Sequence, residues 1–356
     1  MNTKKTKLVK GDILAVRTLT RLRDDFQAMR KRMDGRIGRK ASGEYQDIPQ
    51  REFRQEDLVL FMAIADAARK QEDTIKKELE NVLQRFPIYT EFLSKIKGLG
   101  PVAAGWIVGE YDIHEASTVS KMWQYTGLNP GLVIGKKRKE MKNGRFSLEL
   151  TDTLVKADRQ TPGFVSPFNK RLRTAMVGVM ATDIIKTNVR YRNADDDEYA
   201  QVPNAYRRIK KNKDGTEQKQ VLLELSGYAK MYVDYKARLE SSDKMTTETK
   251  KGGTVVELPW KEATDGHRDM AARRYMVKMF LKDLYVAWRT LEGLPVRPTY
   301  QEEYLGHVHS SPPVISESDE PRKPFSESVP KLPRKPSSKS VPLQTQVSHQ
   351  KNVPIQ

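Results

Sequence analysis

"KIKGLGPVAAGWIVGEYDI", residues Lys95 to Ile113, contains the turn that decides the expected fold. Two glycines flank Leu99, and Pro101 follows at a position where a new helix can begin. Small residues after Pro101 keep that helix thin, so it can pack closely on the helix before the turn. The pattern predicts two short helices joined by a hairpin, with Leu99 pointing into the core.

The same hairpin is suited to holding a phosphate group. Gly98 and Gly100 can adopt positive φ, and neither has a side chain to keep a phosphate away from the backbone. The N–H groups of Gly100, Val102 and Ala103 would point outward at a helix N-terminus, which favours an anion, and Lys97 lies beside them. This indicates a helix-hairpin-helix, which binds the DNA backbone without reading bases. The alternative is a packing motif in which the glycines serve geometry alone.

Composition favours a polyanionic partner. The chain has 356 residues, a formal net charge of +18 and 37% apolar residues, enough for about two folded domains. It contains no cysteine, which excludes disulfides, thiolate zinc sites and a cysteine nucleophile. The longest apolar run, 58–65, is too short to span a bilayer, and the N-terminus lacks a signal-peptide core. We therefore expect a cytoplasmic protein that binds no membrane.

Helical periodicity dominates the chain. Apolar residues recur at helical spacing over about 13–33, 55–85, 167–187, 223–240 and 266–291. The predicted fold class is therefore all-α. An Asp214-Gly215 turn between polar, partly β-branched stretches suggests an exposed hairpin, with a mobile loop as the alternative.

The sequence predicts three parts. Residues 1–88 form a helical hairpin resembling a coiled coil, which could pair with a second copy, so we expect a homo-oligomer. Residues 89–308 form the helix-hairpin-helix bundle, with looped insertions near 190–222 and 241–264. Residues 309–356 are rich in Pro, Ser and Lys, and this composition predicts a disordered tail.

Three further groups of cations are candidate DNA contacts. One is a compact cluster after "GLNPGLVIG", which we expect to lie in a loop, and the others lie on the helices at 167–187 and 266–291. A merely solvated charged face is the alternative for each group. The cations concerned are Lys136, Lys137, Arg138, Lys139, Arg171, Arg173, Arg274, Lys278 and Lys282.

The sequence supports candidate catalytic and metal-binding residues less well than the candidate DNA contacts. The acidic run 195–198 lacks the spaced ligands of a calcium loop, and we interpret it as a solvated loop. His307 and His309 lie at the edge of the expected tail, and we interpret the pair as incidental. The sequence contains no phosphate-binding loop of an ATPase. Catalytic residues and metal ligands are not assigned.

Several segments follow a familiar order: "IKGLGPVAAGWIVGEYDIHEASTVSKMWQYTGLNP", "FNKRLRTAMVGVMA", "YAKMYVDYKARLE" and "GHRDMAARRYMVKMFLKDLYVAWR". Over about 92–306 the chain resembles the C-terminal domain of the DEDD-type insertion-sequence transposases. That family includes the pilin gene-inverting recombinases and the bridge-RNA-guided recombinases. The preceding helical hairpin looks like the family's coiled-coil connector. The glycine turn and Gly127-Leu128-Asn129-Pro130 are the most specific parts of the resemblance.

Two departures qualify what the resemblance implies. Family members carry an N-terminal nuclease-like domain whose acidic residues bind magnesium, whereas this chain starts at the connector. We therefore expect no cofactor in this chain, and magnesium only with a separate nuclease-domain subunit. The family also places a nucleophilic serine after Gly-Leu-x-Pro, where this chain has 133–135, Val-Ile-Gly. Ser147 and Ser166 lie further on, with no activating base evident nearby.

The predicted function is transposase-related DNA binding in the transposition or recombination of a mobile element, with its enzymatic activity left open. One alternative is a non-catalytic architectural or junction-binding DNA protein. The other is a scaffold for a structured RNA, because positive surfaces alone do not distinguish the two polymers.

Overall fold

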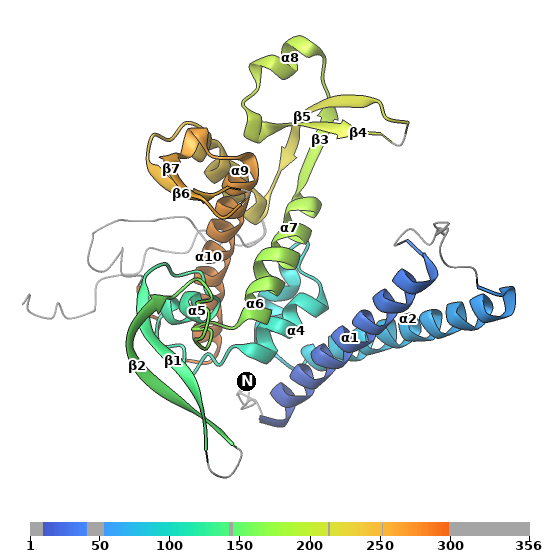
Figure 1. Ribbon diagram of the computed structural model, residues 1–356, viewed down its shortest axis with the longest axis vertical. Coiled ribbons are helices and arrows are strands. Elements are labelled where there is room, and N and C mark those ends of the chain that lie inside the picture. Colours follow the sequence, from blue (N-terminus) through green and yellow to red (C-terminus); the bar gives the residue numbers. More distant parts are fainter. Residues whose placement is uncertain (1–9, 41–52, 142–144, 213, 251, 299–356) are drawn as a thin grey trace, which may run out of the picture. The chain divides into compact units, whose positions relative to one another are not determined.

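The computed structural model describes residues 10–40, 53–141, 145–212, 214–250 and 252–298 (Figure 1). The predicted tail, 309–356, and the pair His307 and His309 lie outside these residues. The described helices are α1 (Lys10–Ile37), α2 (Gln55–Leu83), α3 (Pro87–Glu91), α4 (Pro101–Glu110), α5 (Val119–Tyr125), α6 (Lys170–Arg173), α7 (Ala181–Asn188), α8 (Asp196–Gln201), α9 (Gly227–Glu240) and α10 (Asp265–Leu291). A π-helical segment, Thr174–Met180, joins α6 to α7.

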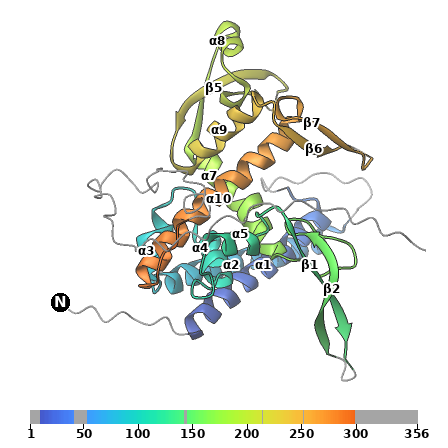
Figure 2. The ribbon, with the colours of Figure 1, turned by 90° about the vertical axis from the view of Figure 1, so that its left-hand side faces the viewer.

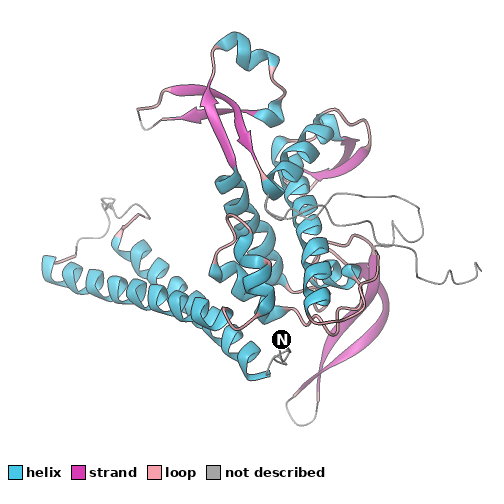
Figure 3. Ribbon diagram, turned by 180° about the vertical axis from the view of Figure 1, so that it is seen from behind, coloured by secondary structure: helices cyan, strands magenta, loops and turns pink. Residues whose placement is uncertain are grey.

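The all-α prediction is wrong, because the described residues also contain seven strands in three antiparallel sheets (Figure 3). The strands are β1 (Leu132–Glu140), β2 (Phe146–Lys156), β3 (Val189–Asn193), β4 (Arg207–Lys211), β5 (Glu217–Leu225), β6 (Met245–Thr249) and β7 (Val255–Pro259). Their orders are β1-β2, β3-β5-β4 and β6-β7. The fold is therefore mixed α/β, and both expected looped insertions contain paired strands. The Asp214-Gly215 turn does connect two paired strands, β4 and β5.

The first two helices form an antiparallel hairpin fastened by buried charges. Glu72 of α2 is 8% exposed and accepts from Arg23 at 2.8 Å and from Arg30 at 2.9 Å, both on α1. Val16 and Leu79 are fully buried and belong to the same core as α4 and α10. The hairpin and the helices after it thus share one hydrophobic core.

The long helix α10 supplies much of that core. Phe280, Leu281 and Leu284 are fully buried, and α9 lies along α10 (Figure 2). Predicted helices at 266–291 and 55–85 are confirmed with small shifts of their ends, whereas the predicted helix at 223–240 begins only at Gly227, after β5. None of the described helices combines the length and apolar character needed to cross a bilayer.

Candidate nucleic-acid interface

The glycine turn adopts the predicted hairpin, but its two glycines have different roles. Gly98 has φ +91°, and a Cβ there would lie 2.8 Å from the Cα of Ile184 on α7. The lack of a side chain at Gly98 therefore serves close packing on α7. Gly100 has φ −80°, and a Cβ built on it meets nothing within 4 Å. Of the two glycines, Gly100 is the one at which a phosphate could approach.

Around Gly100 the surface is open. Gly100 and Lys97 are exposed, while Leu99 is buried as expected. Val102 is partly buried and Ala103 is buried at the start of α4, where the first N–H groups lack acceptors within the helix. Residues of the turn line one shallow hollow with part of α7: Ser94, Ile96, Lys97, Gly98, Leu99, Gly100, Asp183, Lys186 and Thr187.

The run Lys136–Lys139 lies in a strand, which corrects the expected loop. All four side chains are exposed on β1, and strand geometry sends Lys136 and Arg138 to one face and Lys137 and Lys139 to the other. Lys139 pairs with Glu149 at 3.2 Å, and the Lys137 ammonium lies 5.1 Å from the centre of the Phe164 ring. The four cations therefore do not form one contact surface.

Arg171, the first predicted contact on α6, is engaged within the protein. Its guanidinium lies 2.5 Å from a carboxylate oxygen of Asp24 on α1, and the indole of Trp106 donates to the same oxygen. This pair fastens α6 to the helical hairpin, so a phosphate would have to compete with Asp24 for Arg171.

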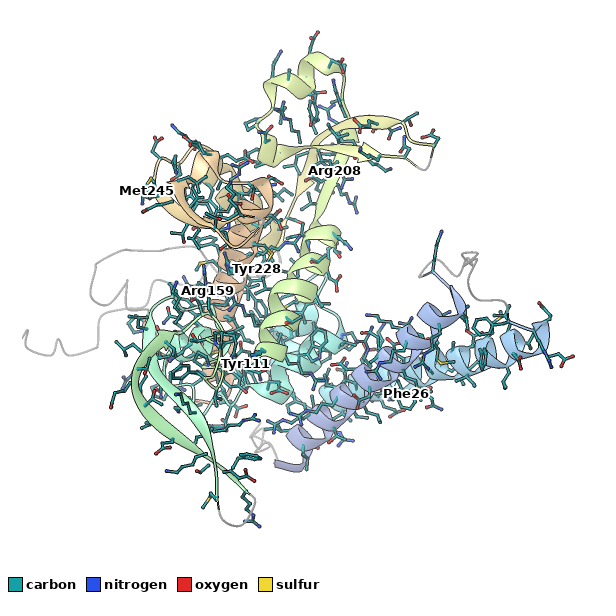
Figure 4. All side chains as sticks on the ribbon, viewed as in Figure 1. Phe26, Tyr111, Arg159, Arg208, Tyr228 and Met245 are labelled. Carbon is teal, nitrogen blue, oxygen red and sulfur yellow. The ribbon has the colours of Figure 1, made fainter. Side chains whose placement is uncertain are left out.

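The structure brings Arg173, Arg274 and Lys278 together, and adds Arg159, which sequence analysis missed. We call these four residues the cation cluster. Arg274 and Lys278 lie one turn apart on α10, Arg173 ends α6, and Arg159 comes from the loop after β2. In Figure 4 Arg159 lies beside α10, between the β1–β2 and β6–β7 hairpins. Arg173, Arg274 and Lys278 are partly buried, whereas Arg159 is exposed.

Electrostatics indicate that these cations repel one another. Burial lowers the pKa of Arg274, and the charge of Arg173 lowers it further. Burial likewise lowers the pKa of Lys278, with Arg274 as the next cause. The charge of Asp158 opposes both effects, yet within the described ranges neither side chain forms an ion pair with a carboxylate. The cluster therefore has excess positive charge in a partly desolvated position, which suits an anion.

Aromatic rings hold the cluster in place. The guanidinium carbon of Arg173 lies 5.0 Å from the centre of the Phe168 ring, and the ammonium of Lys278 lies 5.2 Å from that of Trp123. Gly127 has φ +72°, and a Cβ there would lie 2.6 Å from the Phe168 ring. The glycine of the Gly-Leu-Asn-Pro element thus makes room for the ring that supports Arg173.

A second basic site lies across the loop that carries Arg159. Lys137, Arg138 and Lys170 line a hollow of about 530 Å³ together with Gln160 and Phe164 of that loop. Gln160 follows Arg159 directly, so the loop joins this hollow to the cation cluster. Arg159 stands singly in the sequence and no spacing signal points to it, whereas Lys170 directly precedes Arg171 at the start of the helix expected at 167–187.

The remaining candidates lie elsewhere. Lys282 follows Lys278 by one turn, and its charge acts on the buried Asp283. Ser147 and Ser166 donate to the carbonyl oxygens of Lys139, at 3.4 Å, and Phe168, at 2.9 Å. Among the residues that the structure describes, neither hydroxyl hydrogen-bonds to an imidazole or a carboxylate.

Two of the four acidic side chains at 195–198 pair with cations. Asp195 caps α8 by accepting from the N–H of Glu198 at 2.8 Å. Glu198 pairs with Arg192, and Asp196 pairs with Lys219 at 2.8 Å. Among the residues that the structure describes, no group of three or more histidine or acidic side chains is arranged to hold a metal ion.

Comparison with known proteins found no protein-family model, curated protein or solved structure that matches the chain.

Proposed function

We propose that this protein binds DNA through the phosphate backbone and acts in the transposition or recombination of a mobile element. The cation cluster carries the binding part of the proposal, because three of the predicted contact residues converge there and form no ion pair with a carboxylate of the described chain. The transposition part rests on the resemblance of the glycine turn and the Gly-Leu-Asn-Pro element to the transposase family.

The energetics of the cluster support a binding role over a structural one. A structural cation is normally paired, and its removal destabilises the fold. Here burial and the neighbouring cations lower the pKa values of Arg274 and Lys278, so their charges oppose folding in the free protein. A bound phosphate would neutralise this repulsion. The cluster thus has the electrostatics of a site whose partner is an anion.

The experiment is a salt titration of binding to labelled duplex DNA by the wild type and by Arg274→Gln/Lys278→Gln. Removing one cation that neutralises a phosphate should lower the slope of log K against log salt by about 0.9. We expect the variant to bind more weakly, with a smaller salt slope and an unchanged or higher melting temperature. An unchanged slope would remove the cluster from the DNA footprint.

A matched control removes the same charge elsewhere. Lys76 and Lys77 are exposed on α2, so Lys76→Gln/Lys77→Gln lowers the net charge by the same amount as the cluster variant. If the control weakens binding equally, the effect comes from net charge and the cluster proposal fails.

The second candidate function is architectural DNA binding without strand cleavage. It is favoured by the hydroxyls of Ser147 and Ser166, which hydrogen-bond to carbonyl oxygens and, within the described part of the chain, not to a general base. Running the bound DNA on a denaturing gel, with and without magnesium, separates the candidates. Nicked or protein-linked strands would support a transposase, and intact strands would support the architectural role.

A further inference from the structure

The β1–β2 hairpin has one face that is both apolar and basic. Strand pairing places Lys136 opposite Leu150 and Arg138 opposite Leu148, so these four residues share a face. Ile134 lies opposite Leu154 beyond a register shift between Ile134 and Lys136, and both side chains are exposed next to that face. We call this the ribbon face; its residues are Ile134, Lys136, Arg138, Phe146, Leu148, Leu150 and Leu154. The register adds Glu140, opposite Phe146, at the hairpin's distal end.

The ribbon face is open to solvent. Leu148, Leu150 and Leu154 are 60%, 64% and 58% exposed, and Ile134 is 55% exposed. Apolar patches of this kind mark sites of protein–protein contact, because exposing them to water is unfavourable. A nucleic-acid groove would leave most of this apolar surface without an apolar partner. The observations therefore favour a polypeptide that carries both apolar and acidic side chains.

The start of α2 is acidic and apolar, and so complements the basic and apolar ribbon face. Val59 and Leu60 are 57% and 56% exposed, and Phe53 is 41% exposed. Glu56 and Asp57 lie in the first turn of α2, are exposed, and form no ion pair with the rest of the described chain. We call these five residues the α2 entry patch. In a chain with a net charge of +18, an acidic and apolar patch is a distinctive partner for a basic and apolar one.

We propose that the ribbon face of one copy docks on the α2 entry patch of a second copy. Lys136 and Arg138 then face Glu56 and Asp57, while the leucines of the ribbon cover the apolar residues of the patch. Both surfaces are exposed, so neither covers the other within one copy. The contact joins two different surfaces, and two such contacts related by a twofold axis close a reciprocal dimer.

Charge reversal tests this pairing without DNA. The ribbon variant is Lys136→Glu/Arg138→Glu, and the patch variant is Glu56→Lys/Asp57→Lys. Alone, each variant brings like charges together in both interfaces, and we expect self-association to weaken about tenfold or more. When the two variants are mixed, one interface of a mixed dimer joins two reversed surfaces and the other joins two unchanged surfaces, so both again join opposite charges. The mixture should therefore form a one-to-one dimer, and a chain carrying all four substitutions should recover self-association.

Sedimentation velocity over a concentration series provides the measurement. Lys76→Glu/Lys77→Glu is the control, because it reverses two exposed charges outside both surfaces and should leave association unchanged. Leu148→Ser/Leu150→Ser should weaken association without changing any charge.

Three results would overturn the proposal. They are a wild-type chain that stays monomeric at its highest soluble concentration, single variants that associate like the wild type, and a mixture that shows no dimer. A ribbon variant that weakens only DNA binding would reassign the face to nucleic acid. Because association is measured without DNA, these results leave the proposed function to be judged separately.

Discussion

The side-chain amide of Asn188, at the end of α7, donates a hydrogen bond of 2.8 Å to the carbonyl oxygen of Lys97 in the glycine turn. Asn188 is 6% exposed, and its amide oxygen accepts from the hydroxyl of Ser226. The glycine turn is therefore fixed on one side to α7. Only the side that carries Gly100 is left for a ligand.

Gly98→Ala and Gly100→Ala should consequently have different effects on stability. At Gly98 the added methyl meets the α7 backbone and φ is positive, so we expect unfolding free energy to fall by about 3 kcal/mol. At Gly100 there is space and φ is negative, so stability should change by less than about 1 kcal/mol. If a phosphate approaches Gly100, this variant should still bind DNA more weakly. Urea unfolding and DNA titration of both variants provide the check, and equal destabilisation would contradict the assignment.

A short phosphate ligand should stabilise the wild type through the cation cluster. Any ligand that binds only the folded state raises its stability, and the rise grows with ligand concentration. We expect pyrophosphate to raise the melting temperature of the wild type more than that of Arg274→Gln/Lys278→Gln. Sodium chloride at equal ionic strength is the control for screening. Equal rises in the two proteins would place the anion elsewhere.

Sequence reasoning found the helices because their apolar spacing reports burial. Val277, Phe280, Leu281 and Leu284 repeat at helical spacing, and all four are buried on α10. Sequence reasoning missed β1 and β2. Side chains alternate between the two faces of this hairpin, but both faces contact water, so burial does not mark either of them. Leu148 and Leu150 alternate with polar residues, as in a half-buried strand. The residues that pair with them on β1 are the cations Arg138 and Lys136, so β1 lacks the matching apolar pattern.

The cation cluster could be predicted only in part. The positions of Arg274 and Lys278 on one helical face follow from their spacing of four residues. Their proximity to Arg173 depends on how α6 and α10 pack, across about a hundred residues of chain, and no local pattern encodes it. Trp123, which supports Lys278, is 155 residues away in sequence, whereas Phe168 lies close before Arg173 in the chain. Charge and periodicity named three members, and tertiary packing added the fourth.

The buried charge network of the helical hairpin should be critical for stability. Glu72→Ala leaves Arg23 and Arg30 without their shared carboxylate, and removing one partner of a buried pair costs about 3 kcal/mol. Glu72→Gln keeps an acceptor oxygen and should cost less. Glu78→Ala, at an exposed position on the same helix, is the control and should change stability by about 0.5 kcal/mol or less. Urea unfolding gives these values. If Glu72→Ala left the free energy of unfolding unchanged, the network would contribute nothing to stability.

Asp283 predicts a pH dependence of stability. It is 8% exposed on α10 and accepts from the hydroxyl of Tyr228 at 2.8 Å. Burial raises its pKa to about 6, while the Tyr228 hydrogen bond and the charge of Lys282 limit the rise.

In the unfolded chain this carboxyl has its ordinary pKa of 3.8. Between pH 4 and 6 the folded state therefore binds more protons than the unfolded state. The contribution of Asp283 to the stability of the folded state is therefore most favourable below about pH 4, and it is lost as the pH rises through about 6. Asp283→Asn keeps an acceptor for Tyr228 and cannot ionise. We expect it to be more stable than the wild type at pH 7.5 by up to about 3 kcal/mol, with the difference vanishing near pH 4. Parallel urea titrations across this range measure the difference, which also cancels the contributions of other titrating groups such as His267. A difference that does not vary with pH would show that the carboxyl does not titrate as its burial implies.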